Sequence, residues 1–203
     1  MAQLPYEIQL GRRNGEKQIF IFRQCTPADL AQIVSAQEEV IASMENARIF
    51  ARTSEEEIRE SLEKDLCLGA FCQEKLALFS LMLVNRVSPR NLGSYLGYGE
   101  EELRRSVTYD TTFVMPEFRG FGLQALSCRI KDELALTLGA VRALATVAPE
   151  NEYSLRNVKK HGFHVIEQRP MYSGLDRYIV EKTLIQEAPE KGERHGEGNL
   201  PGN

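Results

Sequence analysis

The chain has 203 residues, of which 42% are hydrophobic and 27% charged, and its formal net charge at pH 7 is −4. This length and composition predict one globular domain and exclude a chain that is disordered throughout. A protein whose main ligand is a phosphate backbone usually carries a basic excess, so the charge argues against nucleic acid as the principal partner.

The apolar segments are too short for a membrane protein. The longest, Leu76–Asn85, has half the length that a helix needs to cross a bilayer, and residues 1–20 hold no apolar block typical of a signal peptide. No Cys-x-x-Cys pair occurs, which favours buried free thiols for Cys25, Cys67, Cys72 and Cys128. We therefore expect a cytoplasmic protein without a membrane segment, and no spacing of His, Cys and Asp indicates a metal site.

Strand and helix signals alternate along residues 17–185. In chain order, the expected elements are a strand over Gln18–Gln24, helices from Thr26 and from Ser54, an antiparallel hairpin of Leu66–Gln73 and Leu76–Asn85, a strand over Ser106–Met115, a helix over Phe121–Leu138, a strand over Val141–Val147, a helix over Asn151–His161, and strands over Phe163–Gln168 and Tyr178–Thr183. This order predicts an α/β fold with a mixed, largely antiparallel central sheet and helices on both faces.

The two ends of the chain are set apart from this pattern. Residues 1–16 are expected to be an N-terminal extension, residues 17–185 a single domain, and residues 186–203 a disordered tail, since the last has one large apolar residue, Leu200.

Two helix starts are well marked. Thr26 precedes Pro27, and Ser54 with Glu57 forms a capping box. In the first of these helices, Leu30, Val34, Gln37 and Ile41 trace one face.

The most informative segment is Val114–Gln124, with the sequence VMPEFRGFGLQ. A strand ends at Pro116, and a glycine-rich turn then opens a long helix. Backbone N–H groups at such a helix start lack intrahelical acceptors, and the helix dipole adds positive charge there, so the segment predicts an anion site. Gly120 and Gly122 remove side chains that would keep a phosphate away. Taken alone, the pattern is equally consistent with a tight turn that binds nothing.

A second segment, Asn151–Phe163, supports the anion-site interpretation. Asn151, Ser154 and Val158 are spaced so that they share one helix face, and a Gly-Phe pair ends the helix. The polar start and the small hydroxyl leave that face shallow enough for an elongated ligand.

With both segments in this order, residues 17–184 resemble the GNAT superfamily of acyl-CoA-dependent N-acetyltransferases. The first segment is similar to the family's Arg/Gln-x-x-Gly-x-Gly/Ala pyrophosphate loop, and the second to its Asn-x-x-Ala/Ser helix. The resemblance implies the GNAT fold and acetyl-CoA as cosubstrate. It implies that backbone amides of the loop hold the pyrophosphate, that a strand edge binds the pantetheine, and that the second helix contacts the arm; these cofactor-binding residues are Phe113, Val114, Arg119, Gly120, Phe121, Gly122, Leu123, Gln124, Asn151 and Ser154. Gln124 departs from the family's Gly or Ala.

The resemblance also assigns candidates for the chemistry. Asp110 lies four residues before Val114, where many members place an acidic general base, although Asp110 could instead bind a backbone group or an acceptor ammonium. The family's general-acid tyrosine corresponds to Val158, so that acid is missing. Tyr172, in the turn between the last two strands, is expected to reach the acceptor cleft as a substrate-binding residue. The long connection Val87–Arg105 is expected to cover that cleft.

These features predict transfer of an acetyl group from acetyl-CoA to a primary amine of a small molecule or peptide, by direct transfer in a ternary complex. The alternatives are a CoA-binding sensor or inactive scaffold with this fold, and an interaction domain whose glycines serve only the turn. The sequence leaves open whether the chain forms a homodimer.

Overall fold

The computed structural model describes residues 4–184. The strands are β1 (Tyr6–Gly11), β2 (Lys17–Gln24), β3 (Leu66–Cys72), β4 (Lys75–Leu83), β5 (Ser106–Val114), β6 (Arg142–Val147), β7 (His164–Met171) and β8 (Leu175–Thr183). The α-helices are α1 (Leu30–Ala42), α2 (Glu55–Lys64), α3 (Glu100–Arg104), α4 (Leu123–Thr137) and α5 (Glu152–Lys160). The predicted tail, residues 186–203, lies outside the described residues.

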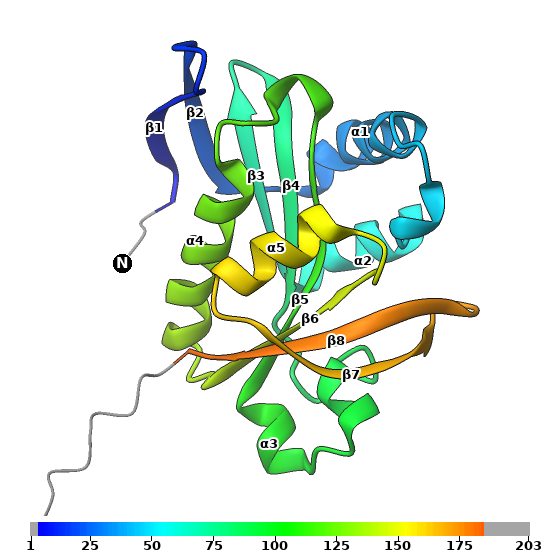
Figure 1. Ribbon diagram of the computed structural model, residues 1–203. Coiled ribbons are helices and arrows are strands. Elements are labelled where there is room, and N and C mark those ends of the chain that lie inside the picture. The colour runs from blue at the N-terminus through cyan, green and yellow to red at the C-terminus, as the bar shows by residue number, and fades with distance from the viewer. Residues whose placement is uncertain (1–3, 185–203) are drawn as a thin grey trace, which may run out of the picture.

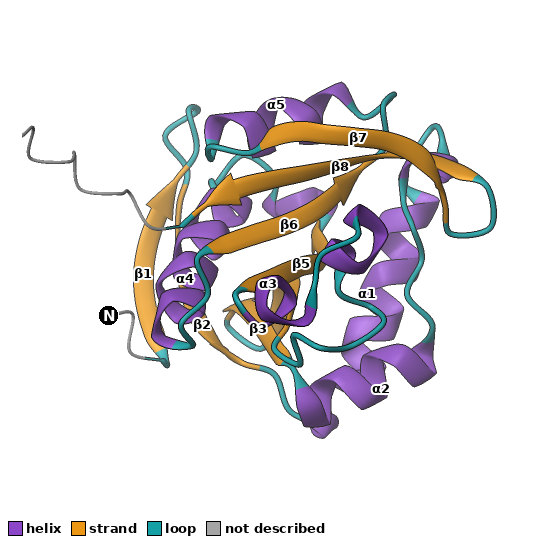
Figure 2. Ribbon diagram, turned by 90° about the horizontal axis from the view of Figure 1, so that it is seen from below, coloured by secondary structure: helices purple, strands orange, loops and turns teal. Residues whose placement is uncertain are grey.

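The strands form one sheet in the order β1-β2-β3-β4-β5-β6-β8-β7. Every neighbouring pair is antiparallel except β5 and β6, which run parallel. Helices α1 and α2 lie on one side of the strands and α4 on the other (Figures 1 and 2). The predicted fold class, a mixed and largely antiparallel sheet with helices on both faces, is confirmed.

The core explains why β3 and β4 are nearly continuous apolar runs. Both strands are buried along most of their length, as expected when helices cover both faces of a sheet. Ile33 of α1 and Ile58 of α2 join this core from one side, and Leu123 and Ile130 of α4 join it from the other. The capping box at Ser54 is present: its hydroxyl accepts the Glu57 N–H, and the Glu57 carboxylate accepts the Ser54 N–H.

Two features differ from the sequence expectations. Strand β1 lies within residues 1–16, where no strand was expected, and it pairs with β2 from Tyr6↔Phe22 to Gly11↔Lys17. As an edge strand it is largely exposed, so its apolar signal is weak. The buried residues of α1 are Ile33, Ala36, Gln37 and Val40, and of the predicted face Gln37 is buried while Leu30 and Val34 pack against the same core partly buried. The difference arises because apolar residues occur on two adjacent sides of this helix, and spacing alone could not choose between them.

The β5–β6 pair positions the site. Parallel pairing runs from Ser106↔Arg142 to Tyr109↔Ala145 and ends there, while β6 continues beside β8 to Val147. The stretch from Asp110 to Val114 therefore has β4 on one side and, among the described residues, no strand on the other. The sheet is split at this point, with a free strand edge facing the opening.

The cysteines and the helices can be compared with the sequence expectations in turn. All four cysteines are free, as expected, and Cys25, Cys67 and Cys128 are buried, but Cys72 is only partly buried. Burial raises the pKa of the Cys67 thiol to about 12, so it stays protonated at neutral pH. Within residues 4–184, no helix has the length and apolar character needed to span a membrane.

Candidate functional site

The loop before α4 is held in place by aromatic packing and by left-handed glycines. Phe118 and Phe121 pack edge-on against Phe20, with ring centroids 5.9 and 5.2 Å away. Gly120 and Gly122 have φ angles of +92° and +77°, a region that residues with a Cβ rarely adopt. Both phenylalanine side chains are buried, so Phe121 can offer a ligand only its backbone.

The start of α4 carries unpaired amides. Gly122 is the N-cap, and its carbonyl accepts the N–H of Leu126 at 3.1 Å, which closes the first helical turn. The N–H groups of the preceding first-turn residues therefore point out of the helix end. Since α4 spans fifteen residues, its dipole adds positive character at this end, as an anion site requires.

A groove of about 740 Å³ runs from this helix start along the free edge of β5 to α5. It brings together all the predicted cofactor-binding residues except Phe121; they are Phe113, Val114, Arg119, Gly120, Gly122, Leu123, Gln124, Asn151 and Ser154. The Arg119 guanidinium donates to Ser43 Oγ at 3.3 Å, and Ser43 also lines the groove. Residues distant in sequence thus line one continuous trough.

Helix α5 is fixed by its own cap and by a contact that the sequence analysis missed. Asn151 Oδ1 accepts the Ser154 N–H at 3.0 Å, so this oxygen is already used by the helix. Asn157 Nδ2 donates to Gln124 Oε1 at 2.9 Å and ties α5 to the first turn of α4. Asn157 follows Ser154 by three residues, so helical spacing alone could have placed it on the groove face.

A second cavity of about 340 Å³ continues the groove at the opening of the sheet, with Asn151 and Ser154 lining both. It contains Asp110, and Arg90 from the connection between β4 and β5 reaches it, with Nη2 3.1 Å from Asp110 Oδ2. Burial raises the pKa of Asp110, and the charge and hydrogen bond of Arg90 oppose that rise. Arg90 also donates to Ser61 Oγ at 3.2 Å, which fixes its direction.

The opposite wall of this cavity holds Tyr172 and Arg177. Tyr172 has a φ of +49° in the β7–β8 turn, its hydroxyl lies 3.1 Å from Thr146 Oγ1, and burial raises its pKa. Arg177 is 3% exposed and donates to the backbone carbonyls of Arg48 and Asp176. Among residues 4–184, no carboxylate side chain forms an ion pair with Arg177.

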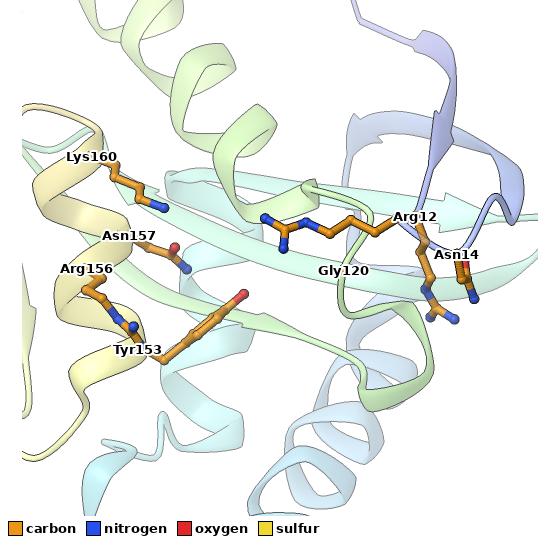
Figure 3. Close-up of a pocket in the computed structure, with 8 residues that line it drawn as sticks. Arg12, Asn14, Gly120, Tyr153, Arg156, Asn157 and Lys160 are labelled. Carbon is orange, nitrogen blue, oxygen red and sulfur yellow. The ribbon is translucent and has the colours of Figure 1, made fainter.

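A third hollow, of about 680 Å³, adjoins the loop on its other side (Figure 3). It is lined by Arg12, Arg13, Asn14, Gly120, Tyr153, Arg156, Asn157 and Lys160. The sequence analysis did not single out these basic residues. Arg156 and Lys160 are one helical turn apart, so helical spacing could have paired these two.

Comparisons with solved structures identify the architecture. An acetyltransferase of the GNAT family from Streptococcus pneumoniae matches with a TM-score of 0.62 and 19% identity, over 81% of this chain and 98% of that one. The structure of yncA from Salmonella typhimurium with its cofactor acetyl-CoA matches with a TM-score of 0.62 and 16% identity, over 85% and 98%. The paia N-acetyltransferase from Thermoplasma acidophilum in complex with coenzyme A matches with a TM-score of 0.60 and 15% identity, over 81% and 98%.

This chain has the GNAT acetyltransferase fold. No family model and no curated protein matches its sequence. Val158, the position that the resemblance assigns to a general-acid tyrosine, is buried in the core, and among the described residues it lines neither the groove nor the cavity beside Asn151 and Ser154. Among residues 4–184, no group of three or more His, Cys, Asp or Glu side chains is arranged to hold a metal ion.

Proposed function

We propose that this protein is an acyl-CoA-dependent N-acyltransferase that transfers an acetyl group from acetyl-CoA to a primary amine. The observation that carries the proposal is the continuity of the site. The groove begins at the α4 N-terminus, which suits a pyrophosphate, follows the free edge of β5, and ends in the cavity with Asp110. A long anionic thioester fits this order of an anion site, a strand edge and a reaction cavity.

Each part of the site has a role in this proposal. The loop amides from Arg119 to Gln124 bind the pyrophosphate, and the edge at Phe113 and Val114 aligns the pantetheine arm as an added strand would. Asp110 takes the proton that the attacking amine must lose. Its burial favours this role, because a carboxylate whose pKa is raised is a stronger base.

Direct transfer in a ternary complex fits the residues that line the site. None of the four cysteines lines the groove or the Asp110 cavity among the described residues. The amine can therefore attack the thioester without a prior acyl-cysteine. The departing thiolate is a fair leaving group unaided, which suits a site that lacks the tyrosine at position 158. In this proposal Tyr172, which lines the same cavity as Asp110, contacts the acceptor.

We further infer that the acceptor is a small amine that also bears an anionic group. A cavity of about 340 Å³ suits a small molecule. Arg177 lines it as a buried cation whose hydrogen-bond acceptors within residues 4–184 are neutral carbonyl oxygens, and a buried charge is stabilised most by an opposite charge. An amino acid would place its amine toward Asp110 and its carboxylate toward Arg177.

Two measurements test the function and the acceptor class. Calorimetric titration with acetyl-CoA should show binding, and release of free CoA should then be followed with matched amines: L-phenylalanine against phenethylamine, and L-leucine against isoamylamine. The proposal expects turnover to be faster for the carboxylated member of a pair. Faster turnover of the decarboxylated member would reject the acceptor class alone. Absence of acetyl-CoA binding would reject the function.

The second candidate is a CoA-binding sensor with this fold. The observation that favours this candidate is Val158, which stands where the resemblance expects a general-acid tyrosine. A sensor would bind acetyl-CoA without releasing CoA in the presence of any amine. Turnover that Asp110→Asn removes would exclude this candidate.

A further inference from the structure

Lys131 is a buried cation without a carboxylate partner. It lies on α4 with 1% of its surface exposed, and within residues 4–184 its ammonium forms no ion pair. The carboxylate beside it in sequence, Asp132, is engaged by the Tyr109 hydroxyl at 2.6 Å and by the Lys182 ammonium at 2.6 Å. Lysine is almost never fully buried unless it is paired, so Lys131 requires an explanation other than packing.

Two side chains that contact this ammonium reach the cavity that holds Asp110. Lys131 Nζ donates to Thr112 Oγ1 at 3.4 Å and lies 4.2 Å from the centroid of the Tyr109 ring. Thr112 and Tyr109 both line the cavity, whereas Lys131 does not. Thr112 also lines the groove along β5, so it lies where the two spaces meet. The cation is therefore separated by a single side chain from the place where donor and acceptor are proposed to react.

The Thr112 hydroxyl can carry a proton between the ammonium and a ligand. Its Oγ1 lies 2.9 Å from Ser80 Oγ and 3.4 Å from Lys131 Nζ. A hydroxyl oxygen can accept two hydrogen bonds and donate one, so Thr112 can accept from both groups and still donate its own proton. Ser80 is fully buried, and among the described residues it lines neither the groove nor the cavity. The ligand space is thus the remaining partner for the Thr112 proton.

The surroundings of Lys131 suit it to release a proton near neutral pH. Burial lowers its pKa to about 8, and the charge of Lys182 lowers the pKa further. The titratable groups around Lys131 and its neighbours are Cys128 and Asp132 of α4, Tyr109 and Asp110 of β5, Lys182 of β8, and His161 at the end of α5. Cys128, Asp132 and Asp110 act to raise the pKa of Lys131, against the larger effect of burial. An acid whose pKa lies near the working pH is the most effective proton donor.

We propose that the Thr112 hydroxyl protonates the thiolate that leaves the acyl donor, and that Lys131 replaces the proton of this hydroxyl. The inference rests on the proposed function. When the bond between the carbonyl carbon and sulfur breaks, its electron pair goes to sulfur, and the sulfur takes the Thr112 proton. The Thr112 oxygen takes a proton from the Lys131 ammonium, which becomes a neutral amine. A proton from solvent returns to this amine after CoA leaves. Thr112 is the catalytic residue of the step, and Lys131 is a positioning residue that acts through it.

This role accounts for a cation that a structural role does not require. An apolar side chain of similar length, such as methionine, would fill the same space without a buried charge. Proteins keep destabilising groups mainly where activity depends on them. The contact between Lys131 and a residue that lines both the groove and the cavity gives such an activity a physical route.

Single-turnover release of CoA tests the proton route. Lys131→Met, Thr112→Val and the unmodified protein, each in excess over acetyl-CoA, are compared from neutral to alkaline pH. The acceptor is whichever of L-phenylalanine, L-leucine, phenethylamine and isoamylamine gives the fastest turnover. Both variants should release CoA about 10- to 100-fold more slowly at pH 7, a modest loss because a thiolate leaves fairly well unaided. The deficit should shrink as pH rises through about 8, since the unmodified protein itself loses the Lys131 proton there.

Two further variants separate the proton route from packing. Thr112→Ser keeps the hydroxyl and should recover most of the rate that Thr112→Val loses. Ser80→Ala removes the other partner of Thr112 Oγ1 and should leave the pH dependence of CoA release unchanged. Urea unfolding of every variant confirms that the rates are those of folded protein.

Two results would overturn the inference and leave the proposed function intact, because the unmodified protein would still transfer the acyl group. One is a deficit of Lys131→Met that is the same at every pH, which would show a packing role. The other is a Thr112→Val variant that releases CoA as fast as the unmodified protein. If the unmodified protein binds acetyl-CoA but releases no CoA with any amine, the inference is rejected together with the proposed function.

Discussion

Arg90 and Asp110 form an ion pair at the split in the sheet, with Arg90 Nη2 3.1 Å from Asp110 Oδ2. Burial raises the pKa of this carboxyl, and the charge and hydrogen bond of Arg90 lower it. Arg90 thus opposes the effect of burial on the carboxyl that is the proposed general base.

Asp110→Asn removes the proposed base and keeps the shape of the side chain. We expect kcat to fall about 10²- to 10⁴-fold, which is the range for a lost general base. The affinity for acetyl-CoA should be unchanged, because the groove lies beyond Asp110. Steady-state kinetics and calorimetry on the same preparation check both parts. Turnover that equals that of the unmodified protein at every pH would remove Asp110 from the mechanism.

Arg90→Met should alter the pH dependence of turnover. Arg90 lowers the pKa of Asp110 against the rise caused by burial, so its removal should raise that pKa further. Activity requires the ionised carboxylate, so the acidic limb of kcat/KM should move to higher pH in the variant. A pH–rate profile measures this shift. A limb that stays in place would show that another group titrates there.

The sequence predicted the parts of the site that depend on local conformation. Gly120 and Gly122 could be identified because the left-handed turn needs glycine, whereas Asp110 was named only through the family resemblance, by its place four residues before Val114. Arg90 could not be predicted, because its contact with Asp110 depends on how the connection between β4 and β5 folds back. Arg12 was missed because β1 is an exposed edge strand, whose position against the α4 loop appears only in three dimensions.

Gly122→Asp tests the anion site at the start of α4. The new carboxylate would stand where the pyrophosphate is proposed to bind, so acetyl-CoA affinity should be lost. No atom lies within 4 Å of a Cβ built on Gly122, so the space is open, but a φ of +77° strains any side chain. Gly122→Ala is therefore the control, because it adds the strain, on the order of 1 kcal/mol, without the charge. Normal affinity in Gly122→Asp would reject the assignment of the loop.

Lys131→Met should stabilise the protein. Lys131 is 1% exposed, and within residues 4–184 its ammonium donates to Thr112 Oγ1 at 3.4 Å and lies 4.2 Å from the centroid of the Tyr109 ring. Burial lowers its pKa from 10.5 to about 8. At pH 7 Lys131 is therefore a buried cation, which destabilises the folded state. We expect the variant to gain about 1–3 kcal/mol in unfolding free energy at pH 7.

The pH dependence of that gain separates charge from packing. The unfolded chain holds the Lys131 proton up to a higher pH, so the unmodified protein recovers stability between pH 8 and 10.5, and the gain should shrink there. Urea unfolding at pH 7 and at alkaline pH measures it. Arg129→Met, at an exposed position of the same helix, should change the free energy by less than about 0.5 kcal/mol.

Asp29→Asn should destabilise the protein at neutral pH. Both carboxylate oxygens of Asp29 accept from Arg23, at 2.7 and 2.9 Å, and one also accepts the Thr26 N–H at 2.8 Å. The hydrogen bonds from Arg23 lower the pKa of Asp29 from 3.8 to about 2. This shift favours the folded state at pH 7 by about 1–2 kcal/mol, after allowance for the partial exposure of Arg23.

The stabilisation by Asp29 should disappear in acid. It is complete above pH 3.8, where the unfolded carboxyl is ionised, and it is lost as pH falls through about 2, where the folded carboxyl takes up its proton. The difference in unfolding free energy between Asp29→Asn and the unmodified protein should therefore narrow across this interval. Glu63→Gln, at an exposed position on α2, controls for the removal of one negative charge. A difference that stays constant down to the acid end would show that Asp29 acts through its hydrogen-bonding shape, because the asparagine would then be deficient at every pH.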